Sequence, residues 1–251
     1  KRRSFSAGLT TSEKSQTGYY VIRDASDMMV IDCGPVGPDY QPGHAHADTL
    51  SFELAVNGRR IIVDSGVYDY EPGRRRTYAR STRAHNTLCI DQQDQSETWG
   101  VFRVARRAYP IYGRITGDGE VRATFEGAHD GYARLSGRLT HSRVIEYVSP
   151  GEWTVRDTVN GEGIHTIESL LHVHPDYRLL LVGRSAEIRD ERGNAILVIA
   201  PTPNVALTIE PGWYFPEFGL EYPNSTLVRT YRGTVPVTII YGMTKMDSTP
   251  L

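Results

Sequence analysis

Cysteine and long hydrophobic runs are both scarce in this chain of 251 residues. Two cysteines, Cys33 and Cys89, are too few for a disulfide framework. Both lie in short apolar runs, so we expect two buried free thiols. No run approaches the roughly 18 apolar residues that a membrane-spanning helix needs, and there is no charged and then apolar leader. The sequence therefore predicts neither a disulfide-stapled fold nor a membrane span.

An excess of charge of either sign is also missing. Lysine and arginine number 28 against 30 aspartates and glutamates, a formal net charge of -2. Nucleic-acid-binding domains usually have a basic balance, so we expect no nucleic-acid partner. Hydrophobic content of 39% and charged content of 23% are ordinary for a globular protein.

A sustained helical period is absent, and short runs of β-branched and aromatic residues take its place. Residues 143–148 and 153–157 alternate between apolar and polar, as strands with one buried face do. Hairpin signals lie at 56–59, 116–119, 159–162 and 192–194. The pattern predicts an all-β fold, a large antiparallel β-sandwich of stacked sheets with almost no helix. We expect 1–17, polar and rich in Ser and Thr, to be a flexible lead-in and 18–251 to be one domain.

Three of the eight histidines lie between residues 43 and 91. His44 and His46 are two positions apart, so on a strand both would face one side, and Asp48 could join them. Asp64 ends an apolar run, and His85 precedes another. Histidines and a carboxylate from neighbouring strands suit a zinc-type site with an open position. Spacing alone also allows histidines that only satisfy hydrogen bonds.

The segment between Asp64 and His85 is basic although the whole chain is slightly acidic. It contains arginines 74, 75, 76, 80 and 83, together with tyrosines 68, 70 and 78. A solvated loop would explain any one of these arginines, but the cluster favours an anionic substrate, because arginine binds carboxylate or sulfate through paired hydrogen bonds. Arg80 and Arg83 are the candidates for substrate binding.

Four motifs occur in a fixed order at 15–23 (SQTGYYVIR), 43–48 (GHAHAD), 63–70 (VDSGVYDY) and 80–87 (RSTRAHNT). In this combination the chain resembles the C-terminal β-domain of the heparinase II/III-like polysaccharide lyases, most strongly over about residues 15 to 100. The resemblance implies that 18–251 is that β-sandwich domain. It also implies that members cleave uronic-acid-containing polysaccharides by β-elimination.

Residue by residue, the resemblance implies one zinc ion held by His46, Asp64 and His85, which organises the cleft. His44 matches the histidine that faces the substrate, and Tyr70, or less closely Tyr68, matches a tyrosine lining the cleft. Elimination needs a base for the C5 proton, an acid for the departing O4 and a donor that neutralises the carboxylate; a histidine and a tyrosine can supply the first two.

The chain departs from the family in one respect, because complete members carry an N-terminal helical (α/α) toroid that no part of this sequence resembles. Starting at Lys1, the chain is expected to be part of a longer lyase and to be inactive, or nearly so, by itself. The resemblance also implies a periplasmic or secreted enzyme.

Two other functions remain open from the residues. A cupin-like metal oxygenase also uses His-x-His with a carboxylate, although cupins place a glutamate a few residues after the pair. A non-catalytic carbohydrate-binding or structural sandwich would need the histidines only for hydrogen bonds. We expect the remaining histidines to be structural or exposed: His129, His141, His165, His172 and His174.

Overall fold

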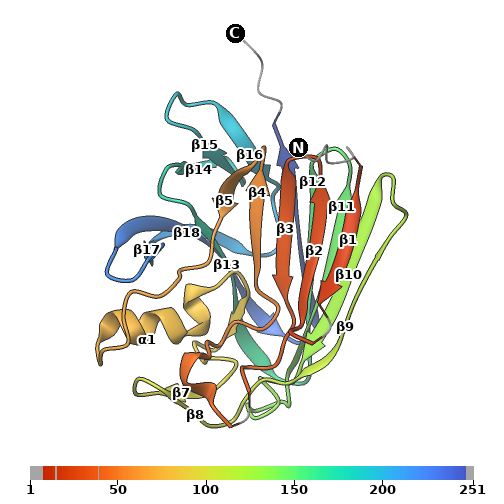
Figure 1. Cartoon of the computed structure of the whole chain (residues 1–251). Helices are drawn as coiled ribbons and strands as arrows, with labels where there is room; N and C mark the ends of the chain where they lie inside the picture. The colour runs from red at the N-terminus through yellow and green to blue at the C-terminus, as the bar shows by residue number, and fades with distance from the viewer. Residues whose placement is uncertain (1–7, 15, 39, 247–251) are drawn as a thin grey trace.

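Two antiparallel sheets packed face to face form the chain, as Figure 1 shows. The computed structural model describes residues 8–246 except 15 and 39. The nine-stranded sheet contains β1 (Thr10–Lys14), β2 (Tyr19–Asp24), β3 (Asp27–Asp32), β4 (Phe52–Val56), β5 (Arg59–Ile62), β13 (Ile164–Val173), β18 (Tyr222–Thr234) and β17 (Ala206–Tyr214) in that order, with β6 (Leu88–Ile90) beside β13. The predicted β-sandwich with almost no helix is confirmed.

The eight-stranded sheet covers the other side of the core. Its order is β14 (Arg178–Val182), β15 (Ser185–Arg189), β16 (Ala195–Ile199), β19 (Val237–Lys245), β12 (Glu152–Asn160), β11 (Thr140–Val148), β10 (Arg122–His129) and β9 (Pro110–Gly117). In β12 every second residue is buried, among them Trp153 and Val155. These side chains belong to the same hydrophobic core as Phe52 and Leu54 from the first sheet, so the alternation seen in the sequence corresponds to the inner face.

Local turn signals predict some connections and not others. Asn57 and Gly58, both with positive φ, join β4 to β5 as the predicted hairpin. The hairpin predicted at 159–162 is wrong, because β12 and β13 belong to different sheets. A Cβ at Gly161 would lie 2.7 Å from the Gly137 carbonyl oxygen, so this glycine serves a close backbone approach at the crossover.

The lead-in predicted over 1–17 contains a strand. Thr10 to Lys14 form β1, which pairs with β2 at the edge of the sheet. The prediction is therefore wrong for these residues, because a mostly exposed edge strand of polar residues lacks the alternation that marks a half-buried one. Residues 1–7 and 15 lie outside the described part of the chain.

One end of the sandwich, the lower end in Figure 1, carries the irregular segments. They include the helix α1 (Arg74–Arg80), the short 3₁₀ turns η1 (Pro42–His44) and η2 (Thr82–Ala84), and the small hairpin of β7 (Thr98–Trp99) and β8 (Arg103–Val104). The arginine-rich segment expected to be a loop is thus partly helical.

Both cysteines are buried free thiols, as predicted. Among the described residues, the helices are too short to cross a membrane.

Candidate metal and acid–base site

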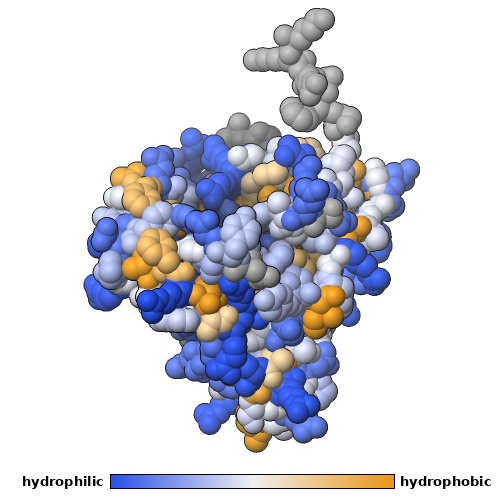
Figure 2. All heavy atoms as spheres, turned by 60° about the horizontal axis from the view of Figure 1, so that its bottom comes forward, coloured by the Kyte–Doolittle hydropathy of each residue, from blue (hydrophilic) through white to orange (hydrophobic). Residues whose placement is uncertain are grey.

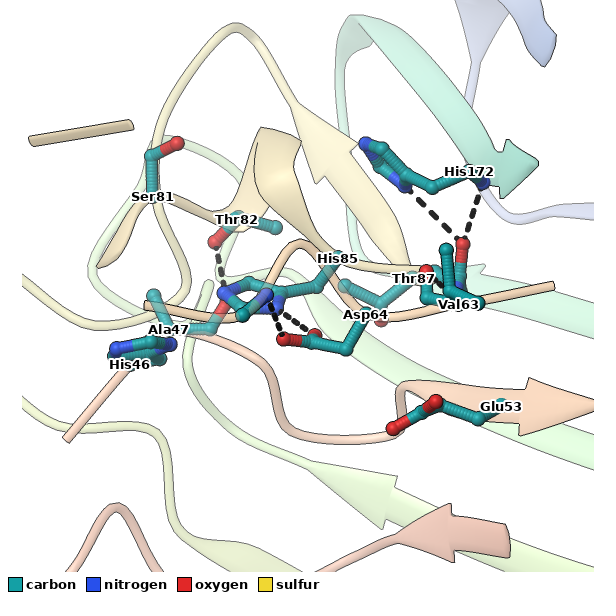
Figure 3. Close-up of polar contacts among 12 residues, drawn as sticks. His46, Ala47, Glu53, Val63, Asp64, Ser81, Thr82, His85, Thr87 and His172 are labelled. Atoms are coloured by element: carbon teal, nitrogen blue, oxygen red, sulfur yellow. Dashed lines mark hydrogen bonds and ion pairs between the residues drawn. The ribbon is translucent and has the colours of Figure 1, made fainter. Parts of the chain in front are cut away.

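His46, Asp64 and His85 converge at this end of the sandwich, as Figure 3 shows. One potential ligand atom from each lies within 4.8 Å of the others. The predicted residues therefore meet, but the strand predicted for His44 and His46 is wrong. His44 ends η1, His46 lies in the following irregular segment, and His85 directly follows η2.

The segment that carries His46 is held against the end of α1. The Ala47 amide donates to the Arg80 carbonyl at 3.0 Å, and the Thr82 hydroxyl donates to the Ala47 carbonyl at 2.9 Å. The Arg80 guanidinium is buried and donates to the carbonyls of Ala45, Gly100 and Arg103. Arg80, predicted to bind substrate, thus uses its donors to join the His46 segment to the hairpin of β7 and β8.

Arg76 is a second buried arginine beside the site, and the sequence pattern predicted no separate role for it. It donates to the carbonyls of Gly43 and Val101, and its Nη1 lies 3.4 Å from His46 Nε2. Its guanidinium also lies 4.9 Å from the centre of the Tyr70 ring. Arg76 therefore fixes the histidine segment relative to Tyr70.

Asn86, next to His85, anchors the other side of the cluster. Its side-chain amide donates to the carbonyls of Phe52 and Val63 at 2.8 and 2.9 Å, and its oxygen accepts the His172 amide at 2.7 Å. Because Val63 precedes Asp64, one side chain places two of the three candidate ligands. His172, predicted to be structural or exposed, is buried, and its Nε2 lies 3.0 Å from the Arg83 carbonyl oxygen.

Asp64 and His85 form a charged pair. Burial opposes a charge on the His85 ring, but Asp64 and Asp48 outweigh it and raise the pKa of His85 to about 9. Burial likewise opposes the Asp64 carboxylate, but His85 outweighs it and holds the pKa of Asp64 below its usual range. Burial and the His85 charge lower the pKa of His46 to about 3, so His46 is neutral. A neutral imidazole and an ionised carboxylate are the forms in which these groups bind metals, so His46 and Asp64 already have the binding form, whereas His85 would release a proton when an ion binds.

The cluster fits a metal ion. His85 Nδ1 lies 2.5 Å from Asp64 Oδ2, whereas His85 Nε2 is buried without a hydrogen-bond partner. A buried polar atom that lacks a partner is costly, and a bound ion would remove that cost. Two histidines and one carboxylate match the donor set of zinc sites that keep an open coordination position.

His44 and Tyr70 form a second feature next to the cluster. The Tyr70 hydroxyl lies 2.8 Å from His44 Nδ1, and the His44 side chain is exposed. Tyr70 packs against Phe102 and Phe218, which orients its ring. Tyr68 instead packs on Phe215 and under Arg75, away from His44. The pair can pass a proton between a ring nitrogen and a phenol in a position open to solvent.

A cleft of about 480 Å³ opens beside these residues and contains both His44 and His46. Asp32 and Asp48 also line it. Burial raises the pKa of Asp48, and burial together with Asp48 raises the pKa of Asp32. The cleft therefore carries less negative charge than two carboxyl groups would give in water. In Figure 2 the face at this end is mainly hydrophilic, with separate hydrophobic patches.

Arg83, the other arginine predicted to bind substrate, is partly exposed. It forms ion pairs with Glu168 and Glu210. Both predicted substrate arginines thus have partners within the chain, and a role in binding remains a prediction.

A family model and two related proteins all place this chain among the same group of proteins. A family model described as heparinase II/III-like, C-terminal, matches residues 10–246. A heparin-sulfate lyase of Pedobacter heparinus is 34% identical over 88 residues, which cover 32% of this chain and 13% of that protein. A heparin-sulfate lyase of Bacteroides stercoris is 29% identical over 97 residues, 36% of this chain and 14% of that protein.

Solved structures agree on the fold. A heparan sulfate lyase from Pedobacter heparinus superposes with a TM-score of 0.77 and 21% identity, over 100% of this chain and 38% of that one. A heparinase III structure gives a TM-score of 0.73 and 19% identity, over 93% of this chain and 36% of that one. The chain thus spans less than two fifths of the length of either structure.

Proposed function

Because this chain belongs to the heparinase II/III-like C-terminal family, we propose that it forms the β-sandwich part of a polysaccharide lyase. The substrate is an acidic, uronic-acid-containing glycan cleaved by β-elimination. The observation that carries the proposal is the hydrogen bond between His44 and Tyr70, which lies at an open cleft beside the His46, Asp64 and His85 cluster.

The reaction removes the proton on C5, breaks the bond between C4 and O4, and leaves a double bond between C4 and C5. In the proposed arrangement His44 and Tyr70 divide the proton transfers, one accepting the C5 proton and the other donating to O4. Their 2.8 Å contact allows the proton to pass between them after product leaves, which restores the starting state.

His46, Asp64 and His85 would hold one zinc ion. When bound, the ion supplies a fixed positive charge that keeps the three segments together. The residues around it determine the shape of the cleft, because Arg76 joins the His46 segment to Tyr70.

A further domain is part of the proposal. The chain matches little more than a third of the related lyase structures, and the donors of Arg80 are used within the chain. We therefore propose that a helical domain N-terminal to this chain supplies the group that neutralises the substrate carboxylate. The isolated chain should then be nearly inactive. A periplasmic or secreted location is proposed from the bacterial relatives.

Metal content tests the cluster directly. We expect about one zinc per chain in protein purified without chelator, and loss of that zinc in both His46→Ala and His85→Ala. His174→Ala is a matched control outside the cluster and should keep the metal. Iron in place of zinc would favour a metal oxygenase, and absence of metal from the unchanged protein would contradict the proposed site.

Elimination is followed by the ultraviolet absorbance of the new double bond. The chain joined to its N-terminal domain should cleave a uronate polymer, and Tyr70→Phe should abolish most of that activity while leaving the zinc content unchanged. Glycan binding without cleavage in the joined protein would identify a binding module instead. Efficient cleavage by the isolated chain would contradict the need for the second domain.

A further inference from the structure

A second pocket lies elsewhere on the sandwich and shares no residue with the metal cluster. It has a volume of about 230 Å³ and lies among the turn between β14 and β15, the end of β16, and strands β17 and β18. Its wall is formed by Gly183, Arg184, Ile199, Ala200, Thr202, Val205, Leu207 and Arg229.

Arg229 gives this pocket a buried positive charge. The side chain is 1% exposed, and neither Nη1 nor Nη2 has a hydrogen-bond partner. One face of the guanidinium lies 3.8 Å from the centre of the Tyr241 ring. A guanidinium stays charged in proteins, and a buried charge without a counter-charge is strongly destabilising.

The neighbouring groups do not balance that charge. Asp157 is the carboxylate that acts on Arg229, but both of its oxygens are bound by Arg143. Burial lowers the pKa of His141 and raises the pKa of Tyr241, so both are neutral. Among the described residues, this part of the core holds two guanidinium groups and one carboxylate, which leaves one positive charge in excess.

A hydroxyl group in the pocket wall also lacks a partner. Thr202 Oγ1 is buried and has no hydrogen-bond partner. Arg184 lies exposed in the pocket wall. The guanidinium groups of Arg229 and Arg184 are donors only, whereas the Thr202 hydroxyl can both donate and accept. Water could satisfy some of these hydrogen bonds, but it could not balance the charge.

We propose that this pocket binds an oxyanion, a carboxylate or sulfate group, between Arg229, Thr202 and Arg184. Such a group accepts several hydrogen bonds, donates none, and carries the charge that the core lacks. The source of the group is either a free anion or an acidic sugar. The inference does not depend on the proposed lyase function, because it rests on other residues.

Melting temperature of the full chain tests the proposal. Sodium sulfate and sodium glucuronate are titrated at constant ionic strength set with sodium chloride, and glucose is the uncharged control. We expect a saturable rise of a few degrees with at least one anion, since a ligand that binds only the folded state stabilises it by mass action. Saturation by sulfate alone identifies a free-anion site, and preference for glucuronate identifies an acidic-sugar site. A rise that never saturates is the general effect of salt and overturns the proposal.

Variants of the pocket residues test whether the rise in melting temperature comes from binding in this pocket. Thr202→Val and Arg184→Gln should each weaken anion binding severalfold, and Arg229→Met should abolish it. Arg178→Gln, which removes an exposed arginine of β14 outside the pocket, should leave binding unchanged. If Arg229→Met does not fold, the other two variants decide. Binding equal to that of the unchanged chain in both of them overturns the proposal.

Discussion

A single asparagine side chain joins the strand ends around the candidate site. Asn86 donates to carbonyls on two segments and accepts an amide from a third, and all of these groups are buried. The main-chain carbonyl of Asn86 accepts a hydrogen bond from the Arg143 guanidinium, which comes from the opposite sheet. The position of His85 therefore depends on a residue that never touches the substrate in the proposed mechanism.

Replacing Asn86 with alanine should lower the free energy of unfolding by about 3 kcal/mol, because two buried carbonyls and one buried amide lose their partner. Urea unfolding measures the change, and zinc content should fall with it. Asn194→Ala is the matched control, since its amide bonds an exposed aspartate at a turn and should cost well under 1 kcal/mol. Equal costs for the two variants would contradict this role.

Residue type and order in the sequence predicted which side chains meet, but not their surroundings. His46, Asp64 and His85 were predicted to lie together, and they do, whereas the buried position of Arg80, predicted to bind substrate, was not foreseen. Arginine is usually exposed, and only the fold shows that three backbone carbonyls surround this one. Arg76 was missed for the same reason.

Strands β10, β11 and β12 share a buried chain of hydrogen bonds with a fixed direction. The Gly131 amide donates to His129 Nδ1, so His129 Nε2 carries the proton and donates to His141 Nδ1 at 3.2 Å. His141 Nε2 then donates to Asp157 at 2.9 Å. Both histidines are neutral in this arrangement, and burial lowers the pKa of each.

This network predicts loss of stability in mild acid. Both folded-state pKa values lie below the unfolded value of about 6.5, so below that pH the unfolded chain binds protons that the folded chain does not. The contribution of His129 and His141 to stability should be complete above about pH 6.5, and below that pH it should fall by up to about 1.4 kcal/mol per pH unit for each of them.

Urea unfolding at pH 7.5 and at pH 5.5 measures this loss. Asp157 does not contribute in that interval, because its depressed pKa makes it relevant only in stronger acid. The double variant His129→Gln, His141→Gln should have a shallower dependence on pH, whatever its absolute stability. An unchanged dependence would place the acid sensitivity in other histidines.

At the scale of elements, periodicity predicted strands and local turn residues predicted hairpins, but neither determines which sheet a strand enters. Asn57 and Asn160 each precede a glycine, and only the first turn closes a hairpin. Strand β1 was missed because its polar residues satisfy backbone pairing at an edge without a buried face.

At the scale of the whole molecule, the candidate site joins segments that are distant in the chain. Asp64 and His85 are 21 positions apart. Asp64 follows Val63, whose carbonyl accepts from the Asn86 side chain, and His46 precedes Ala47, whose amide donates to the Arg80 carbonyl. The end of the sandwich that carries the irregular segments is therefore the part whose stability should depend on an ion. The sheets themselves are held by the apolar core between them.

A chelator should accordingly lower the melting temperature of the zinc-loaded chain by several degrees. Metal at about 100 times its dissociation constant contributes about 2.7 kcal/mol to the folded state, and a domain of this size shifts by about 2 to 4 °C per kcal/mol. Calorimetry with and without chelator measures the shift, and added zinc should restore it. His85→Ala should melt lower from the start and show no response to chelator, because its cluster has lost one ligand. If that variant responds as strongly as the unchanged chain, the stabilising ion lies somewhere other than this cluster.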